Sequence, residues 1–339
     1  MARVKQYRAD LLVVAGFLIL PLLLFAQVTL GGRTMIPADN LVQWQPWVGA
    51  AAELGVETPH NTLLSDLLVE NYAWKRFINQ SLAAGEIPLW NPYIFAGAPF
   101  LATGQNAAYY PFSILFMILP LTKAYGWYTV SQLWLAGVLA YFLGRVLRLP
   151  RPAAALAGLV FQGCGFMVVS AAVFPMIIGA AAWLPLLLAC IEMVVRNSGR
   201  ESGGTGKTLP WMVLGAVALG CQILAGHIEI TYYTLLVMGA FAAWRLLRRG
   251  PIMGMVKPAG WLLSMVLAGL MLGAIQFIPL YEVVQTNFRQ GSVSLSEVRG
   301  WAFPARRLIT LGVPDFFGNP SHHSYWDVFS GEKIGRAHV

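Results

Sequence analysis

Long apolar runs alternate with short polar segments along most of the chain, and one long polar segment separates the first run from the others. The runs are about 20 residues long, the length that an α-helix needs to cross a hydrocarbon layer about 30 Å thick. We therefore predict seven membrane-spanning helices. They cover 11–30, 124–147, 152–174, 176–195, 209–226, 228–247 and 259–284. The apolar stretch 110–121 is too short to span, and we expect it to dip into the membrane or lie on it.

The composition supports a membrane protein. Hydrophobic residues make up 57% of the chain and charged residues 11%, whereas soluble domains carry about 25% charged residues. A transmembrane β-barrel would show alternating segments of about ten residues instead of long apolar runs. The expected fold class is therefore all-α, a polytopic bundle of transmembrane helices. Cys164, Cys190 and Cys221 fall inside apolar runs and are interpreted as packing residues rather than disulfide partners.

Residues 1–30 are predicted to form a short cytoplasmic N-terminus and the first spanning helix. Arg3, Lys5 and Arg8 precede the apolar run, a pattern that also suits a secretory signal peptide. However, the run is longer than a typical signal-peptide core, and no small-x-small cleavage site follows it. A signal anchor that stays in the protein is the preferred interpretation.

The placement of positive charge predicts the topology. With the N-terminus in the cytoplasm and one crossing per helix, 13 of the 23 basic residues and only three acidic residues fall on the cytoplasmic side. This excess of Lys and Arg is typical of cytoplasmic loops. The layout places 31–123 outside as a long loop, 124–285 in the membrane as helices two to seven, and 286–333 outside as a tail. The inner loops account for the net charge of +8, so we expect no nucleic-acid partner.

Chemistry carried by the outer segments would face a compartment without ATP or nucleotide sugars. A transferase working there needs a donor that is carried in the membrane. The inner segment Gly203–Thr208 looks like a phosphate-binding loop, but Glu201 occupies the position where that motif requires Gly, and no strand precedes it. It is interpreted as a flexible basic linker.

The last residues of the chain, 334–339, match the translation of a widely used sequencing adapter. We interpret them as a non-native tail and the chain as a gene fragment, and we exclude them from the prediction of the fold.

The outer segment from Ser65 to Phe112 carries the first candidate site. Ser65 is placed to cap a helix that runs to about Ala84 and ends at Gly85. An apolar stripe along this helix is expected to face the bilayer or the bundle. It comprises Leu64, Leu67, Leu68, Asn71, Lys75, Ile78 and Leu82.

Two acidic and two basic residues lie close together on this predicted helix. Asp66 and Glu70 are spaced i, i+4 on a face of their own, and Lys75 and Arg76 come a turn later. Paired acids beside paired bases suit a site that takes up a proton and holds an anionic phosphate. The alternative is a solvated helix face with surface ion pairs.

Other ionisable residues are expected near the outer surface. Asp39 follows the first predicted helix by nine residues and is either functional or an interface anchor. His227 and Glu229 lie in the turn between two predicted helices, as a site or as a simple polar hairpin. Glu282, near the outer end of the last helix, could face the same cavity or only the membrane interface. His227 and Glu229 are too few for a metal site, and His322-His323 is assigned to a flexible loop.

Several outer aromatic residues could stack on sugar rings, but an aromatic belt at the membrane interface is the favoured interpretation. They are Trp44, Trp47, Trp74, Trp90, Tyr109 and Tyr110.

Several motifs together resemble one family. The stretches SDLLVENYAWKRF, GEIPLWNPYIFAGAPFLA and AYYPF resemble the first outer loop of the YfhO-like bacterial membrane proteins. The AGHIEITYY turn and the FFGNPS and YW pieces of the tail are similar as well, so the resemblance covers nearly the whole chain to about Asp327. That family is grouped with the GT-C glycosyltransferases, multi-pass enzymes that use polyprenyl-phosphate-linked sugars.

The resemblance implies roles for specific residues. GT-C enzymes typically use an Asp of the first outer loop as the base or to orient the acceptor, and Asp39 and Asp66 are the two matching positions. Asp66 is favoured because it opens the helix that bears Lys75 and Arg76, which would hold the donor phosphate. Glu70, His227, Glu229 and Glu282 are predicted to bind substrate. The turn departs from the family's commoner His-Pro-Gln, which puts the role of His227 and Glu229 in doubt.

The leading hypothesis is thus a glycosyltransferase of the bacterial inner membrane. It would transfer a sugar from a polyprenyl-phosphate donor to a glycan or protein acceptor of the cell envelope, with no cofactor established and a divalent metal ion left open. The alternative is a non-enzymatic transporter or assembly factor for lipid-linked precursors, which should carry broken helices and mid-membrane ionisable residues. A third possibility is that the fragment is inactive by itself.

Overall fold

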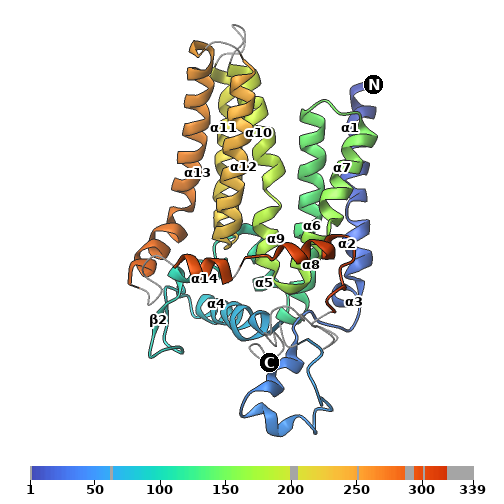
Figure 1. Ribbon diagram of the computed structural model, residues 1–339, viewed down its shortest axis with the longest axis vertical. Coiled ribbons are helices and arrows are strands. Elements are labelled where there is room, and N and C mark those ends of the chain that lie inside the picture. The colour runs from blue at the N-terminus through green and yellow to red at the C-terminus, as the bar shows by residue number, and fades with distance from the viewer. Residues whose placement is uncertain are drawn as a thin grey trace. The chain divides into compact units, whose positions relative to one another are not determined.

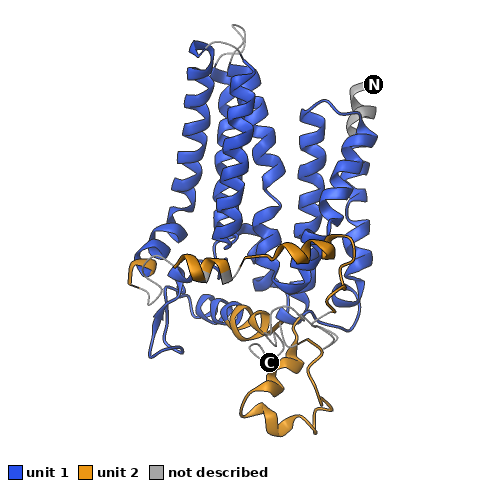
Figure 2. Cartoon of the chain, viewed as in Figure 1, with its two compact units in different colours: residues 1–35, 74–283 blue, residues 36–73, 284–339 orange. Residues whose placement is uncertain are grey.

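The computed structural model describes residues 2–61, 64–198, 205–249, 252–286, 294–300 and 302–318. Most of these residues are helical (Figure 1), and the one sheet among them consists of two short antiparallel strands. They fall into two compact units (Figure 2). Unit 1 comprises 1–35 and 74–283, and unit 2 comprises 36–73 and 284–339. The predicted outer loop 31–123 is thereby divided twice: 36–73 belong to unit 2, and 31–35 and 74–123 belong to unit 1.

Six helical segments of the described chain are long and apolar enough to cross a membrane. They are α6 (Leu121–Val146), α7 with α8 (Arg151–Gly163, Gly165–Val173), α9 with α10 (Pro175–Ala181, Leu184–Ser198), α11 (Thr205–Leu224), α12 (Ile228–Leu247) and α13 (Met253–Thr286). These correspond to the last six predicted spans. The all-α fold class and the membrane class are confirmed.

The first apolar run is not one continuous helix. It forms α1 (Ala2–Gly16), α2 (Ile19–Leu24) and α3 (Ala26–Thr29). Pro21 explains the break before α2, because proline has no N–H for the carbonyl four residues earlier and fits best in the first turn of a helix. The carbonyl that Pro21 leaves without a helical partner belongs to Phe17, and the side-chain amide of Gln162 donates to it at 2.7 Å. That this run crosses the membrane stays a prediction.

Small residues bring the helices of unit 1 close together, as is common between helices in membranes. A Cβ atom on Gly158 of α7 would lie 2.7 Å from the carbonyl oxygen of Gly137 on α6. The helices α10, α11, α12 and α13 form a neighbouring group (Figure 1), in which a Cβ on Gly269 of α13 would lie 2.7 Å from Leu219 of α11. The core of this group includes the buried side chains of Leu187, Cys190, Val194, Leu219 and Met265.

Charged side chains are paired near one end of these helices. Glu192 of α10 is buried, and its carboxylate accepts hydrogen bonds of 2.7 Å from both Arg196 and Arg245. Asp10 of α1 accepts a hydrogen bond of 2.8 Å from Arg151 at the start of α7. The bonds from Arg245 of α12 and from Arg151 of α7 each join helices that are distant in sequence, whereas Arg196 lies one turn from Glu192 on the same helix. Pairing is the condition under which a buried carboxylate such as that of Glu192 is tolerated. This end is the one that the charge pattern places in the cytoplasm, and the orientation stays a prediction.

A helix over this stretch is confirmed, since every residue from Ser65 to Ala83 is helical, but Ser65 lies within the helix and is not its N-cap. It contains a π-helical stretch, η4 (Leu67–Tyr72), followed by α4 (Ala73–Ala83). Gly85 ends it with a left-handed φ of 76°, a conformation that glycine adopts without strain.

The other elements are short. Unit 1 contains β1 (Trp90–Asn91), β2 (Ala98–Pro99), η5 (Leu101–Thr103), η6 (Pro111–Ser113) and α5 (Ile114–Ile118). Unit 2 contains η1 (Ala38–Gln43), η2 (Trp47–Ala50), α14 (Leu295–Gly300) and η7 (Ala305–Leu311). As expected, the stretch 110–121 forms no spanning helix; its contact with the membrane stays a prediction. His322-His323 and residues 334–339 lie outside the described residues.

Candidate functional site

An irregular loop of unit 1 is buried against the helix ends. Asn106 is fully buried, and its side-chain amide donates to the carbonyl of Phe100 at 2.8 Å and to the hydroxyl of Thr103 at 3.0 Å. Gln276 of α13 donates to the carbonyl of Gly104 at 2.7 Å. Irregular backbone within or beside a membrane requires such internal partners. We call residues 103–107 the buried loop, and Lys75 of α4 makes a hydrogen bond to it.

The side chain of Lys75 points toward the buried loop. Its side chain is 1% exposed, its ammonium donates to the carbonyl of Asn106 at 2.7 Å, and it lies 4.7 Å from the centre of the Phe116 ring. Within the described residues no carboxylate lies within 4 Å of it, and burial lowers the pKa of Lys75 from 10.5 to about 7. The neighbouring Arg76 is exposed. The predicted basic pair is therefore divided: Lys75 anchors the buried loop, and only Arg76 meets solvent.

Asp66 and Glu70 belong to unit 2 and lie on the exposed side of their helix. Burial raises the pKa of Glu70, and the negative charge of Asp66 raises it further. The two acids are thus electrostatic neighbours, as their spacing predicts. Neither lines the hollow that the structure forms elsewhere in unit 2.

That hollow surrounds Asp39. It has a volume of about 720 Å³ and is lined by Asp39, Glu57, Thr58 and His60, together with small and apolar residues of the segment 51–56. One carboxylate oxygen of Asp39 accepts a hydrogen bond of 2.7 Å from the backbone N–H of His60. The volume is within the range of about 300–1,000 Å³ that small-molecule sites occupy. A held carboxylate beside an open space can accept a proton from a bound hydroxyl.

Two adjacent hydrogen bonds join the two segments beside this hollow. The Asp39–His60 hydrogen bond is followed by one from the side-chain amide of Asn40 to the carbonyl of Asn61, at 3.0 Å. Asn40 is fully buried, so its amide has a structural role. The sequence prediction named Asp39 but missed Glu57 and His60, because a separation of about twenty residues matches no secondary-structure period. The polar run from Glu57 to Asn61 was the available signal.

The turn between α11 and α12 brings its two predicted residues together. Nδ1 of His227 lies 3.0 Å from a carboxylate oxygen of Glu229. Burial lowers the pKa of His227, and the carboxylate of Glu229 opposes this shift. Glu282 lies exposed on α13. Among the described residues no three His, Cys, Asp or Glu side chains are grouped so as to hold a metal ion.

The six predicted aromatic residues differ in exposure, and two of them, Trp74 and Tyr109, are half-buried. Tyr110 is buried, and its hydroxyl donates to the side chain of Gln132 at 2.7 Å and accepts from the indole of Trp183 at 3.2 Å. It is therefore part of the core of unit 1. Trp44, Trp47 and Trp90 are exposed, so they are available either to a ligand or to the membrane interface.

Comparisons with protein-family models, with curated proteins and with solved structures found no match for this chain. Membership of the YfhO-like family therefore stays a prediction from the sequence motifs. The functional argument rests on the residues of the two units.

Proposed function

We propose that this chain is part of a YfhO-like, GT-C-type membrane glycosyltransferase. It takes a sugar from a polyprenyl-phosphate donor and attaches it to a cell-envelope acceptor on the outer face of the bacterial inner membrane. The observation that carries the proposal is the hollow of unit 2, where the carboxylate of Asp39 is held at 2.7 Å by the N–H of His60. The basic inner loops support placing this hollow on the outer side.

In the proposed reaction, Asp39 acts as the general base. Its carboxylate accepts the proton of an acceptor hydroxyl while the hydroxyl oxygen forms a bond to the anomeric carbon of the donor sugar. The bond between that carbon and the phosphate oxygen breaks, and polyprenyl phosphate leaves with the electron pair. The backbone N–H of His60 orients the carboxylate without neutralising it.

The hollow shifts the preference between the two predicted bases. The sequence favoured Asp66 because it opens the helix that bears the basic pair. Asp39 lines an open hollow together with a second acid, Glu57, and with His60, whereas Asp66 lies exposed outside that hollow. The proposal therefore assigns the base to Asp39.

The broken helices favour one second candidate, a transporter of lipid-linked precursors. The segment Arg151–Val173 is interrupted at Cys164, which has an extended backbone, and the first apolar run is interrupted before Ile19 and at Phe25. Discontinuous helices are common where transporters bind their substrates. This candidate predicts movement of the intact lipid-linked sugar rather than cleavage of its glycosyl–phosphate bond.

A reconstituted system distinguishes the two. The chain is inserted into proteoliposomes with polyprenyl-phosphate-linked sugars radiolabelled in the sugar, and envelope polysaccharide is supplied as the acceptor. We expect time-dependent transfer of label to the acceptor with release of an equal amount of polyprenyl phosphate. The glycosyltransferase proposal is refuted if the label changes leaflet while still attached to the lipid. It is also refuted if the donor is not consumed.

A further inference from the structure

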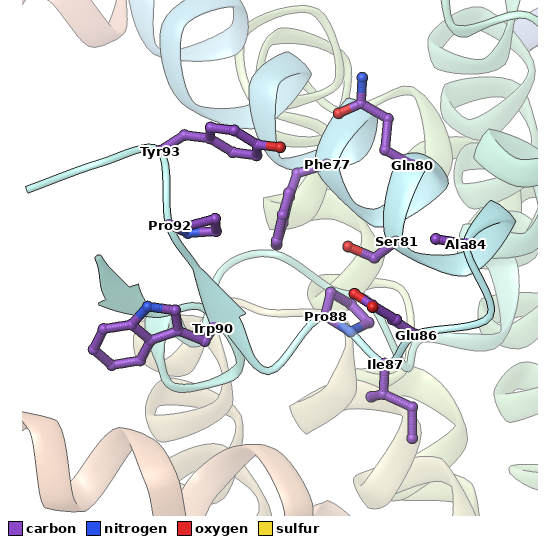
Figure 3. A pocket seen from close by; sticks show the side chains of 10 residues that line it. All are labelled: Phe77, Gln80, Ser81, Ala84, Glu86, Ile87, Pro88, Trp90, Pro92 and Tyr93. Atoms are coloured by element: carbon purple, nitrogen blue, oxygen red, sulfur yellow. The ribbon is translucent and has the colours of Figure 1, made fainter. Parts of the chain in front are cut away.

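Unit 1 contains a second hollow, distinct from the one around Asp39. It lies between α4 and the segment 86–93, which leads into and past β1 (Figure 3). Its volume is about 280 Å³. Because typical sites for drug-sized ligands begin at about 300 Å³, this space suits a single small ring rather than an extended chain.

Aromatic and apolar side chains line this hollow from both sides. Phe77 of α4 faces Pro88, Pro92 and Tyr93 across the space (Figure 3), and its ring meets that of Tyr93 edge-on at a centroid distance of 6.1 Å. The ring of Trp90 is 55% exposed and that of Tyr93 79% exposed, so both offer aromatic surface to a ligand.

The Trp90 ring is held in place by the hairpin. It lies so close over Gly97 that a Cβ atom there would come within 2.6 Å of the indole nitrogen. Gly97 also has a φ of 113°, a conformation that other residues rarely adopt. The pairing of Trp90 with Pro99 in the β1–β2 ladder fixes the backbone beneath the ring. The exposed ring is therefore pre-oriented.

Polar groups also line the hollow, two of them on α4 beside Phe77 and one on the facing segment 86–93. They are the amide of Gln80, the hydroxyl of Ser81 and the carboxylate of Glu86 (Figure 3). In the described part of the chain none of these three side chains takes part in a hydrogen bond or an ion pair. The backbone holds them together, because the N–H of Glu86 donates to the carbonyl of Ser81 at 2.9 Å across the turn at Gly85. These groups keep their hydrogen-bonding capacity for a ligand.

We propose that this hollow binds one pyranose ring of a neutral or amino sugar. A pyranose has an apolar C–H face that can lie on an aromatic ring and hydroxyl groups at its edge that bond to amide, hydroxyl and carboxylate groups. The single carboxylate of Glu86, without a cation in the wall, disfavours uronic acids and sugar phosphates. The inference goes beyond the proposed function, because the residues of this saccharide-binding site take no part in the transfer step.

The test measures binding without any transfer reaction. The purified chain is placed in lipid nanodiscs free of glycoside detergents, and saturation-transfer NMR is recorded with glucose, N-acetylglucosamine and glucuronic acid. We expect millimolar binding of the first two sugars and no signal from glucuronic acid. Trp90→Ala should weaken binding about tenfold or more, and Glu86→Gln should admit glucuronic acid.

Trp47→Ala is the matched control, because Trp47 is 47% exposed but lies outside this hollow. It should bind sugar as the unmodified chain does. Tyr93→Ala, at a more exposed position, should also weaken binding, so the proposal does not depend on Trp90→Ala folding. The proposal is overturned if no sugar binds, if both Trp90→Ala and Tyr93→Ala bind like the unmodified chain, or if these changes reduce only insertion into nanodiscs. The last result would make the aromatic residues membrane anchors.

Discussion

Replacing Asp39 with Asn should reduce the rate of sugar transfer by about 10²–10⁴-fold, the range attributed to a general base. The amide keeps the shape of the carboxylate, and its oxygen can still accept the N–H of His60, but it cannot take up the acceptor proton. The measurement is the initial rate of label transfer in proteoliposomes, at equal amounts of inserted protein. Because Asp39 is a surface residue of the hollow, the variant should insert and elute as the unmodified chain does.

Asp66→Asn is the matched control for this prediction. Asp66 occupies the exposed side of its helix outside the hollow, so its loss should change the rate less than about threefold, as for a solvated acid that is not a general base. Glu57→Gln should have an intermediate effect, because Glu57 lines the hollow without the anchoring bond that Asp39 makes. A severe loss in Asp66→Asn combined with normal transfer in Asp39→Asn would reverse the assignment and restore the preference drawn from the sequence.

The thermal stability of the purified chain should rise as the pH is raised from 6 to 9. Burial lowers the pKa of Lys75 from 10.5 to about 7, so between these two values the unfolded chain binds a proton that the folded chain does not. Stability increases with pH wherever the unfolded state binds more protons. Below pH 7 both states are protonated, and the folded state must bury a charged ammonium. The full pKa difference corresponds to about 5 kcal/mol. About 3 kcal/mol of this develops between pH 7 and pH 9, which amounts to several degrees in Tm.

Lys75→Met should remove most of this dependence on pH while keeping the length of the side chain. At pH 9 the variant should be less stable than the unmodified chain, because the carbonyl of Asn106 loses its donor, at a cost of about 1–3 kcal/mol. Arg76→Met, which removes the adjacent exposed cation, should keep the full dependence. Equal slopes of Tm against pH in the unmodified chain and in Lys75→Met would show that another group titrates.

The periodic features of the fold could be predicted from the sequence. Apolar length predicted the six helices that are long and apolar enough to cross a membrane, and Gly85 predicted the end of its helix, where it has a left-handed φ. The helical stripe predicted a buried face, and the structure buries Leu67, Leu68, Asn71, Lys75 and Ile78 on it, although Leu82 at its end is exposed. The same stripe already placed Lys75 on the buried face. The prediction that Lys75 holds the donor phosphate therefore conflicted with the helical period, because a buried side chain does not reach a ligand in solvent.

The non-periodic features could not be predicted in this way. The break at Pro21 depends on the amide of Gln162, which is distant in sequence and supplies the hydrogen bond that the Phe17 carbonyl needs. The segments around Asp39 are joined by hydrogen bonds between Asp39 and His60 and between Asn40 and Asn61. No repeat or spacing in the sequence predicts these hydrogen bonds. Both features arise from single side-chain contacts between segments far apart in the chain.

The side of the membrane on which the Asp39 hollow lies tests the proposed function most directly, because a lipid-linked donor is needed only outside the cytoplasm. Thr58 lines the hollow, and Thr58→Cys can be introduced after Cys164, Cys190 and Cys221 are replaced by Ala. Arg148→Cys, in the exposed turn between α6 and α7, marks the opposite side. With a membrane-impermeant maleimide on intact spheroplasts, we expect labelling of the cysteine at 58 at once and of the cysteine at 148 only after permeabilisation. The reverse pattern would place the hollow in the cytoplasm and contradict transfer from a lipid-linked sugar on the outer face.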